Sequence, residues 1–284
     1  MLKKAWLFFP LVFILTSCFS IGLGVNKSQA EQPSPSAQQS RPAAVQQTEV
    51  TLQEQNDSGH WFSGPQNGRF IIIGVSGRLS RPADEIDAAK QDAARKAAMY
   101  NGIQGSVEHA NTTGSGGFFD YSAESVLNLN YDNNFENYIS NLSFDPEKDV
   151  IRGSGATYIR FVYNSASPNI NFSPEKSIGR PAWVNNRNLP EFDGYETVVG
   201  FAGRRSRLRD TINASYDSAA ARLIESASTK VSSQEGSSTN MGTSAFSATY
   251  IRSEGRLANF QVLAFWIDPD SGAVSTLAIA RVIK

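Results

Sequence analysis

A pattern of glycine, arginine and serine residues occurs twice in this chain, at an offset of 126 residues and without a gap. The first copy begins at Ile73 and the second begins at Val199. Self-similarity at a fixed offset indicates a repeated supersecondary unit, so we expect two copies of one unit. The residues of the first copy that recur as identical residues in the second are Gly74, Gly77, Arg78, Ser80, Arg81, Asp84, Ile86, Ala88, Ala93 and Ala94.

Both copies predict the same order of elements. Short β-rich runs, Phe70 to Ile73 and Thr197 to Val199, end in glycine and predict a strand. A helix is expected next, because apolar and small residues then recur near a 3.6-residue period, and Ser80 and Ser206 are its expected N-caps. Antiparallel strands follow. The predicted fold class is therefore α+β, with two tandem modules in which a helix packs on one face of an antiparallel sheet.

The predicted modules span residues 61–164 and 181–284. The stretch 165–180 is rich in Pro, Ser and Asn and is expected to be a linker. The last two strands join through the turn Asp268–Gly272, whose composition is typical of a hairpin turn and lacks the later glutamate of a calcium loop. Further strands are expected near 124–131, 136–144, 156–162, 228–233, 246–251, 258–266 and 274–282.

Cys18 is the only cysteine, and it follows Leu15-Thr16-Ser17 at the end of an apolar run that begins after Lys3 and Lys4. This order is typical of a secretory signal ending in a bacterial lipobox, so residues 1–18 are predicted to be a lipoprotein signal peptide and lipobox. We expect Cys18 to carry a lipid anchor that includes acyl chains such as palmitate and holds the protein on a membrane. No aspartate follows Cys18, which favours the outer membrane over the inner membrane.

A second cleavage site is compatible with the sequence. Ser28-Gln29-Ala30 fits ordinary signal cleavage, which would leave a periplasmic or secreted protein without Cys18. Residues 19–60 are predicted to be a disordered tether, because the Gln-, Ser- and Pro-rich stretch 31–59 has no aromatic residue and cannot bury much apolar surface. No cysteine remains after Cys18 to form a disulfide, so the folded part depends on its core.

The second copy resembles a known family. Pro181-Ala182-Trp183-Val184 precedes the strand and glycine turn up to Gly203, and the chain ends on Phe265-Trp266-Ile267-Asp268 and Leu277-Ala278-Ile279-Ala280-Arg281. Together these segments resemble the LPP-twenty-like bacterial lipoprotein domain of Helicobacter surface-lipoprotein type, which is similar to the first domain of flagellar assembly protein T. The resemblance covers 181–284, and reaches 61–164 only through the repeat. It implies an envelope lipoprotein and no catalysis.

The glycine and arginine turns are the candidate binding residues. Each turn joins a strand to a helix, where backbone N–H groups attract anions, and arginines add bidentate donors. Arg78, Arg81, Arg204 and Arg207 are therefore candidates for binding a phosphate, a lipid headgroup or an acidic glycan. The alternative is that the glycines serve close packing and the arginines are solvated. The third glycine of a dinucleotide fingerprint is missing.

The sequence gives little support for catalysis, metal binding or nucleic-acid binding. The two histidines, His60 and His109, give neither a persuasive catalytic triad nor a zinc site. The aromatic residues between 118 and 144 are expected to be buried in strands rather than exposed for sugar stacking. A formal net charge of −1 carries no signature of nucleic-acid binding. We expect no catalytic residue, no metal and no cofactor.

The sequence therefore predicts a non-catalytic cell-envelope lipoprotein with a structural or protein-interaction role in an envelope or flagellar assembly. Its expected partners are the membrane, through the lipid on Cys18, and an envelope protein. The alternative is a periplasmic or surface module that binds peptidoglycan, lipid or glycan through the arginine turns or the aromatic region.

Overall fold

The computed structural model describes residues 52–66, 68–114, 123–153, 155–164, 170, 172, 179–185, 188–227, 229–238 and 244–283. Within these ranges the side chains of 52, 110–114, 123–125, 229–238 and 244–250 lie outside the description. All described residues belong to one compact unit, 47–284. Cys18, the signal segment and most of the expected tether and linker lie outside the described residues.

The larger sheet, sheet A, is antiparallel and is organised around one long strand, β11 (Ser244–Ile267). The second half of β11 pairs with β12 (Val274–Ile283), which pairs with β9 (Glu196–Ala202). The first half lies between β10 (Thr229–Ser238) and β4 (Ile103–Gly114), and β4 pairs with β5 (Ala123–Asn130). The short β1 (His60–Phe62) pairs with the end of β11. Helix α4 (Leu208–Ala227) packs on β9, β12 and β11.

The smaller sheet, sheet B, is centred on β3 (Arg69–Gly77) and β8 (Ala156–Tyr163), which pair antiparallel. β2 (Gly64–Gln66) pairs with β3, and β6 (Leu142–Ser143) and β7 (Val150–Arg152) both pair with β8. Helices α2 (Pro82–Asn101) and α3 (Glu136–Ile139) pack on one face of this sheet, through alanines of α2 and aromatic rings of β3 and β8. Short α1 (Leu52–Ser58) precedes β1, and a 3₁₀ helix spans Ala182–Asn185.

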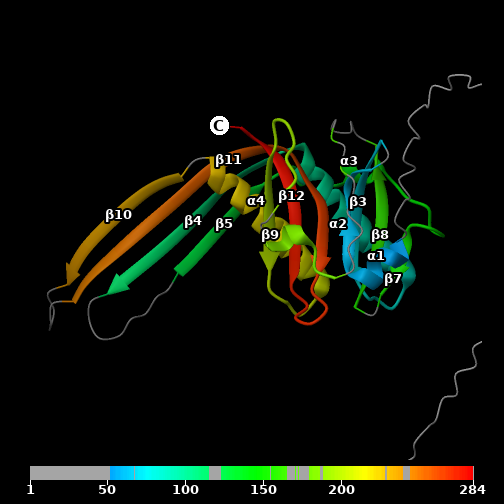
Figure 1. Cartoon of the computed structure of the whole chain (residues 1–284), viewed down its shortest axis with the longest axis horizontal. Coiled ribbons are helices and arrows are strands. Elements are labelled where there is room, and N and C mark those ends of the chain that lie inside the picture. The colour runs from blue at the N-terminus through cyan, green and yellow to red at the C-terminus, as the bar shows by residue number, and fades with distance from the viewer. Residues whose placement is uncertain are drawn as a thin grey trace, which may run out of the picture. The chain divides into compact units, whose positions relative to one another are not determined.

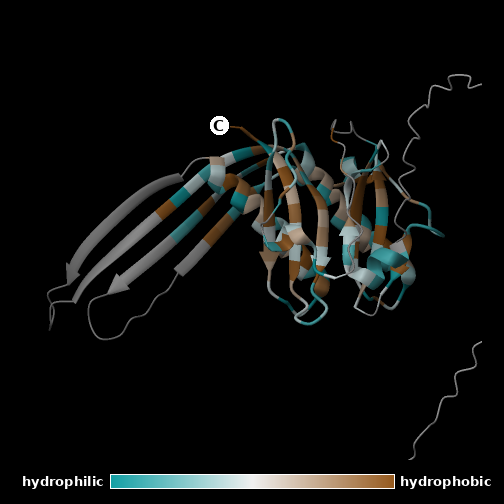
Figure 2. Cartoon of the chain, viewed as in Figure 1, coloured by the Kyte–Doolittle hydropathy of each residue, from teal (hydrophilic) through white to brown (hydrophobic). Residues whose placement is uncertain are grey.

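The α+β fold class predicted from the sequence is confirmed, since helices pack on antiparallel sheets. The predicted boundary at 165–180 does not separate two sheets, because β4 and β5 of the first copy belong to the same sheet as the strands of the second copy. A core of buried side chains from α4, β3, β8, β11 and β12 also runs across the two copies. Figure 2 shows apolar residues concentrated on these strands.

The first glycine of each turn motif allows a helix to pack closely on its strand. A Cβ atom added to Gly74 would lie 2.3 Å from the carbonyl oxygen of Ala89, and one added to Gly200 would lie 2.2 Å from that of Ser215. Ala89 and Ser215 are themselves 126 residues apart, so equivalent residues of the two copies make equivalent packing contacts. No atom lies within 4 Å of a Cβ added to the second glycine, Gly77 or Gly203.

Four strands in the order β10-β11-β4-β5 extend beyond the end of α4, and Figure 1 shows them projecting from the body. We call this projection the arm: β10, β5, and the parts of β4 and β11 that pair with them. Its base lies where α4 ends, since a Cβ added to Gly255 of β11 would lie 2.8 Å from Cβ of Ala227. No helix in the described part of the chain is long and apolar enough to cross a membrane.

Three local predictions were wrong. The tether does not reach residue 60, because α1 forms at 52–58 and His60 is buried in β1. Ser80 and Ser206 are not N-caps: α2 begins at Pro82 after Arg81, which makes no side-chain cap, and α4 begins at Leu208. A strand expected over 136–144 is replaced by α3 and the two-residue β6, because Tyr138 turns inward onto the α2 core.

The aromatic residues described between 118 and 144 are buried or partly buried, as expected, but none of them lies in a strand. Tyr138 is buried, and Tyr131, Phe135 and Phe144 pack against the core of α2, β3 and β8. Phe118, Phe119 and Tyr121 lie outside the described residues.

Candidate functional site

The two arginine turns line one hollow of about 690 Å³, which we call the arginine cleft. The end of β3 and the turn that follows it supply Gly77, Arg78 and Leu79, and the turn between β9 and α4, with the first two residues of α4, supplies residues 204–209. The β11–β12 turn, with Asp268 and Gly272, completes the wall. Residues that are 126 positions apart in the sequence therefore meet in one site.

Positive charge dominates the cleft. Among the described lining residues the only carboxylate is Asp268, against arginines 78, 204, 205, 207 and 209. Asp268 accepts backbone N–H bonds from Asp270 and Ser271 at 2.9 and 3.3 Å. Chiefly the Asp270 N–H holds the pKa of Asp268 below its usual range, so this carboxyl stays ionised. The turn predicted at 268–272 is confirmed, and Gly272 occupies it with φ of 69°.

Arg78 has a structural partner. Its Nε lies 3.3 Å from Oε1 of Glu85, whose side chain is 2% exposed. Glu85 also accepts the N–H of Leu79 at 3.0 Å and the hydroxyl of Thr157 at 2.9 Å, and lies 3.1 Å from Nε of Arg152. Burial alone raises the pKa of Glu85, but these donors and the two arginines together hold it below its usual range. Glu85 therefore fixes the first turn, and Arg78 is partly neutralised.

Arg204 and Arg207 are exposed, and within the described residues neither forms an ion pair with a carboxylate. The Cδ atom of Arg204 would lie 3.1 Å from a Cβ added to Gly272, so the arginine stem packs across the glycine of the opposite turn. Arg209 lies 3.6 Å from Asp210, and Arg81 lies 2.8 Å from Asp84. Three of the four predicted arginines thus line the cleft, and Arg81 lies outside it, paired on the helix.

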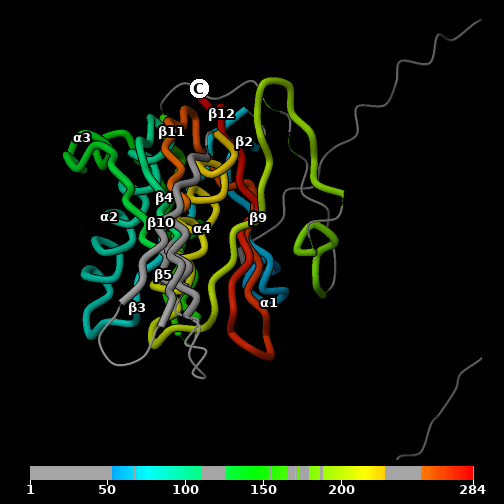
Figure 3. Tube along the Cα trace, turned by 90° about the vertical axis from the view of Figure 1, so that its left-hand side faces the viewer, coloured from blue at the N-terminus to red at the C-terminus, as the bar shows by residue number. Residues whose placement is uncertain are grey.

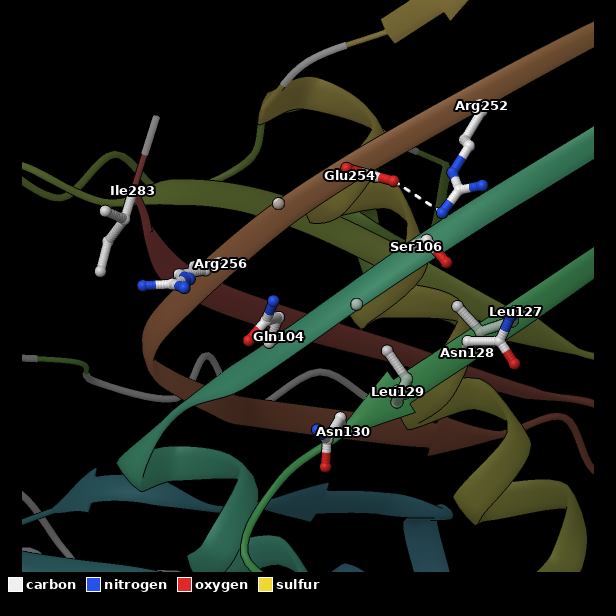
Figure 4. Close-up of a pocket in the computed structure, with 12 residues that line it drawn as sticks. Gln104, Ser106, Leu127, Asn128, Leu129, Asn130, Arg252, Glu254, Arg256 and Ile283 are labelled. Atoms are coloured by element: carbon white, nitrogen blue, oxygen red, sulfur yellow. Dashed lines mark ion pairs between the residues drawn. The ribbon is translucent and has the colours of Figure 1, made fainter.

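A second hollow, of about 840 Å³, lies over the base of the arm and is drawn in Figure 4. Its polar wall, the polar sheet face, consists of alternate side chains on β4, β5 and β11. Arg252 lies 2.7 Å from Glu254 and 3.1 Å from Glu108, so these charges compensate one another. The arginine cleft therefore carries the larger net positive charge. The polar sheet face comprises Gln104, Ser106, Asn128, Asn130, Arg252, Glu254 and Arg256.

A buried ion pair on α2 was not found from the sequence. Nζ of Lys96 lies 2.6 Å from Oδ2 of Asp92, and both side chains are less than 5% exposed. Asp92 accepts the N–H of Val75, and Lys96 donates to the carbonyl of Ile73 at 2.7 Å and lies 4.7 Å from the ring centre of Tyr216. The pair therefore completes the hydrogen bonding of a β3 edge that has no strand beside it, and contacts α4. Its only sequence signal is the i, i+4 spacing, which suggests a surface pair.

The two histidines lie on different strands of sheet A, β1 and β4. His60 is buried beside Phe62 and Trp183, with ring centres 5.1 and 6.0 Å away. His109 lies on β4, with Nε2 2.7 Å from Oε1 of Glu225 on α4. In the part of the chain that the structure describes, no group of three or more His, Cys, Asp and Glu residues could hold a metal ion.

No protein-family model matches this chain, and no curated protein or solved structure matches it. The resemblance to the LPP-twenty-like domain stays a prediction from the residues.

Proposed function

We propose that this chain is a non-catalytic cell-envelope lipoprotein, anchored through Cys18, whose arginine cleft binds an anionic group of a phosphate or acidic-glycan type. The observation that carries the proposal is the convergence of both arginine turns on one hollow of about 690 Å³. Arg204 and Arg207 are the main donors, because their guanidinium groups are exposed and have no carboxylate partner among the described residues. Guanidinium groups bind phosphate and carboxylate with paired N–H donors.

Glu85 contributes to the proposed anion binding indirectly, because it contacts the first arginine turn without lining the cleft. It accepts the N–H of Leu79 and pairs with Arg78 and Arg152, so it positions the first turn and partly neutralises Arg78. The carboxylate of Asp268 would repel a bound anion, but it lies in the β11–β12 turn and accepts hydrogen bonds from backbone N–H groups there. The binding energy therefore depends on the β9–α4 turn.

The test uses calorimetry to measure the binding of tripolyphosphate to the full chain at low and at high salt. Arg204→Glu with Arg207→Glu should weaken binding by at least about tenfold, because charge-assisted hydrogen bonds contribute roughly 1.5–3 kcal/mol each. Arg252→Glu with Arg256→Glu is the matched control, since it also replaces two arginines by glutamates, but on the polar sheet face. Equal losses from the cleft and control variants would mean that tripolyphosphate binds through general charge, and the proposal would fail.

A role in binding an envelope protein is the second proposal, and the arm favours it. β5 and β10 each pair on one side only among the described residues, so both present an edge of backbone N–H and C=O groups to a partner. Crosslinking in cells from Asn128 of β5, with Cys18→Ala as the unanchored control, would capture such a partner.

A further inference from the structure

The turn between β3 and α2 presents an apolar side chain beside the arginines. Leu79 is 48% exposed and lines the arginine cleft, next to Arg78. Its exposure is built into the turn, because its backbone N–H donates to the buried Glu85 at 3.0 Å. An exposed apolar side chain at a basic rim fits a partner that is both anionic and apolar.

We propose that the end of the molecule carrying the arginine cleft docks on an anionic lipid surface, with Leu79 inserted between headgroups and the arginines bound to lipid phosphates. This proposal rests on the anion-binding cleft and names its ligand. A soluble anion would use the arginines alone and leave Leu79 in water, whereas a bilayer offers phosphate charge above an apolar layer. A second exposed apolar side chain, Phe201 at 54%, lies near the end of β9, just before the second arginine turn.

The charge around Leu79 fits this occupant. The cleft carries arginines 78, 204, 205, 207 and 209 against Asp268 alone among its described lining residues. Each basic residue near an anionic membrane surface strengthens binding about fivefold. Burial of a leucine side chain that water now reaches adds roughly a further tenfold. The combination predicts weak but specific docking that salt reduces and that replacement of Leu79 reduces separately.

The single cysteine allows a site-specific test. The full chain carrying Cys18→Ser and Leu79→Cys has one thiol, which can be labelled with an environment-sensitive dye. Vesicles of phosphatidylglycerol mixed with phosphatidylcholine should shift the emission of this dye to the blue, and vesicles of phosphatidylcholine alone should not. The matched control is Cys18→Ser with Val126→Cys, because Val126 is 50% exposed but lies on β5.

Variants separate the two contributions. Arg204→Glu with Arg207→Glu should weaken binding to the anionic vesicles by at least about 25-fold. Leu79→Asn should weaken vesicle binding about tenfold and leave tripolyphosphate binding unchanged. If Leu79→Asn binds vesicles normally, or the dye at position 79 behaves like the dye at position 126, the lipid proposal is overturned while the anion-binding cleft stands. If the arginine pair affects neither ligand, both proposals fall.

Discussion

Replacement of Gly200 by alanine tests the repeat as a packing device. The added Cβ would lie 2.2 Å from the carbonyl oxygen of Ser215, 2.5 Å from the amide nitrogen of Ala219 and 2.8 Å from Cβ of Ala219. The nearest two are backbone atoms of α4, so no side-chain rotation relieves the contact. Ordinary contact begins near 3.4 Å, and the helix would therefore have to move away from β9 by roughly 1 Å.

The cost follows from what α4 buries. Ile212, Tyr216, Leu223 and Ile224 of this helix are 3% exposed or less. A gap of 0.5–1 Å removes roughly a quarter to a half of the dispersion energy of the atoms across it, and overpacking of a core costs about 1–3 kcal/mol and sometimes more. We expect Gly200→Ala to lower the free energy of unfolding by about 3–5 kcal/mol, and Gly74→Ala to have a similar effect through Ala89.

The matched controls are three residues further along each turn. Gly77 and Gly203 have no atom within 4 Å of an added Cβ, and neither has a positive φ. Alanine at these positions should leave stability unchanged or raise it by up to about 1 kcal/mol, because it restricts the unfolded chain. Urea unfolding followed by circular dichroism measures all four variants. Equal midpoints for Gly200→Ala and Gly203→Ala would refute the packing argument.

Two further predictions concern buried charge. Burial lowers the pKa of His60 to about 4. Between pH 6.5 and pH 4 the unfolded chain therefore binds a proton at His60 that the folded chain does not bind. The free energy of unfolding should keep its full value above pH 6.5 and fall by at most about 3 kcal/mol towards pH 4. The difference in urea midpoint between the protein and His60→Gln, measured across that range, should shrink as pH falls, and a difference independent of pH would contradict this. Lys96→Met leaves Asp92 buried without its cation and should cost about 3–5 kcal/mol in urea unfolding. Adding Asp92→Asn should recover much of that loss, since an amide oxygen still accepts the Val75 N–H; no recovery would show that the charge is not the cause.

The sequence predicted the features that depend on local pattern. The strand, the glycine turn and the helix recur at the expected offset, and the packing of Gly74 on Ala89 matches that of Gly200 on Ser215. Features set by pairing between distant segments were missed. Strands were expected separately at 246–251 and 258–266, but β11 runs unbroken through the polar residues between them, because β4 and β12 pair with it there.

The candidate site was partly predictable for the same reason. Arg78, Arg204 and Arg207 were identifiable from the turn motif in each copy, but their meeting in one cleft depends on how the copies pack. Glu85 was not identified as the buried anchor of the first turn, since an acidic residue in a first helical turn is equally typical of a solvated helix end.

Contact between the two helices explains why the turns converge. Arg95 of α2 lies 2.5 Å from Asp217 of α4, Lys96 lies over the ring of Tyr216, and Figure 3 shows the helices side by side. Each helix begins directly after its arginine turn, and both turns line one cleft, so the helix N-termini lie at the same end of the fold. The first copy alone would supply one arginine of the cleft, Arg78, and the second copy alone would supply the other four. The duplication therefore produces the arginine cleft itself: the strands that the first copy contributes to sheet A hold the copies together, and the two turns then line one hollow.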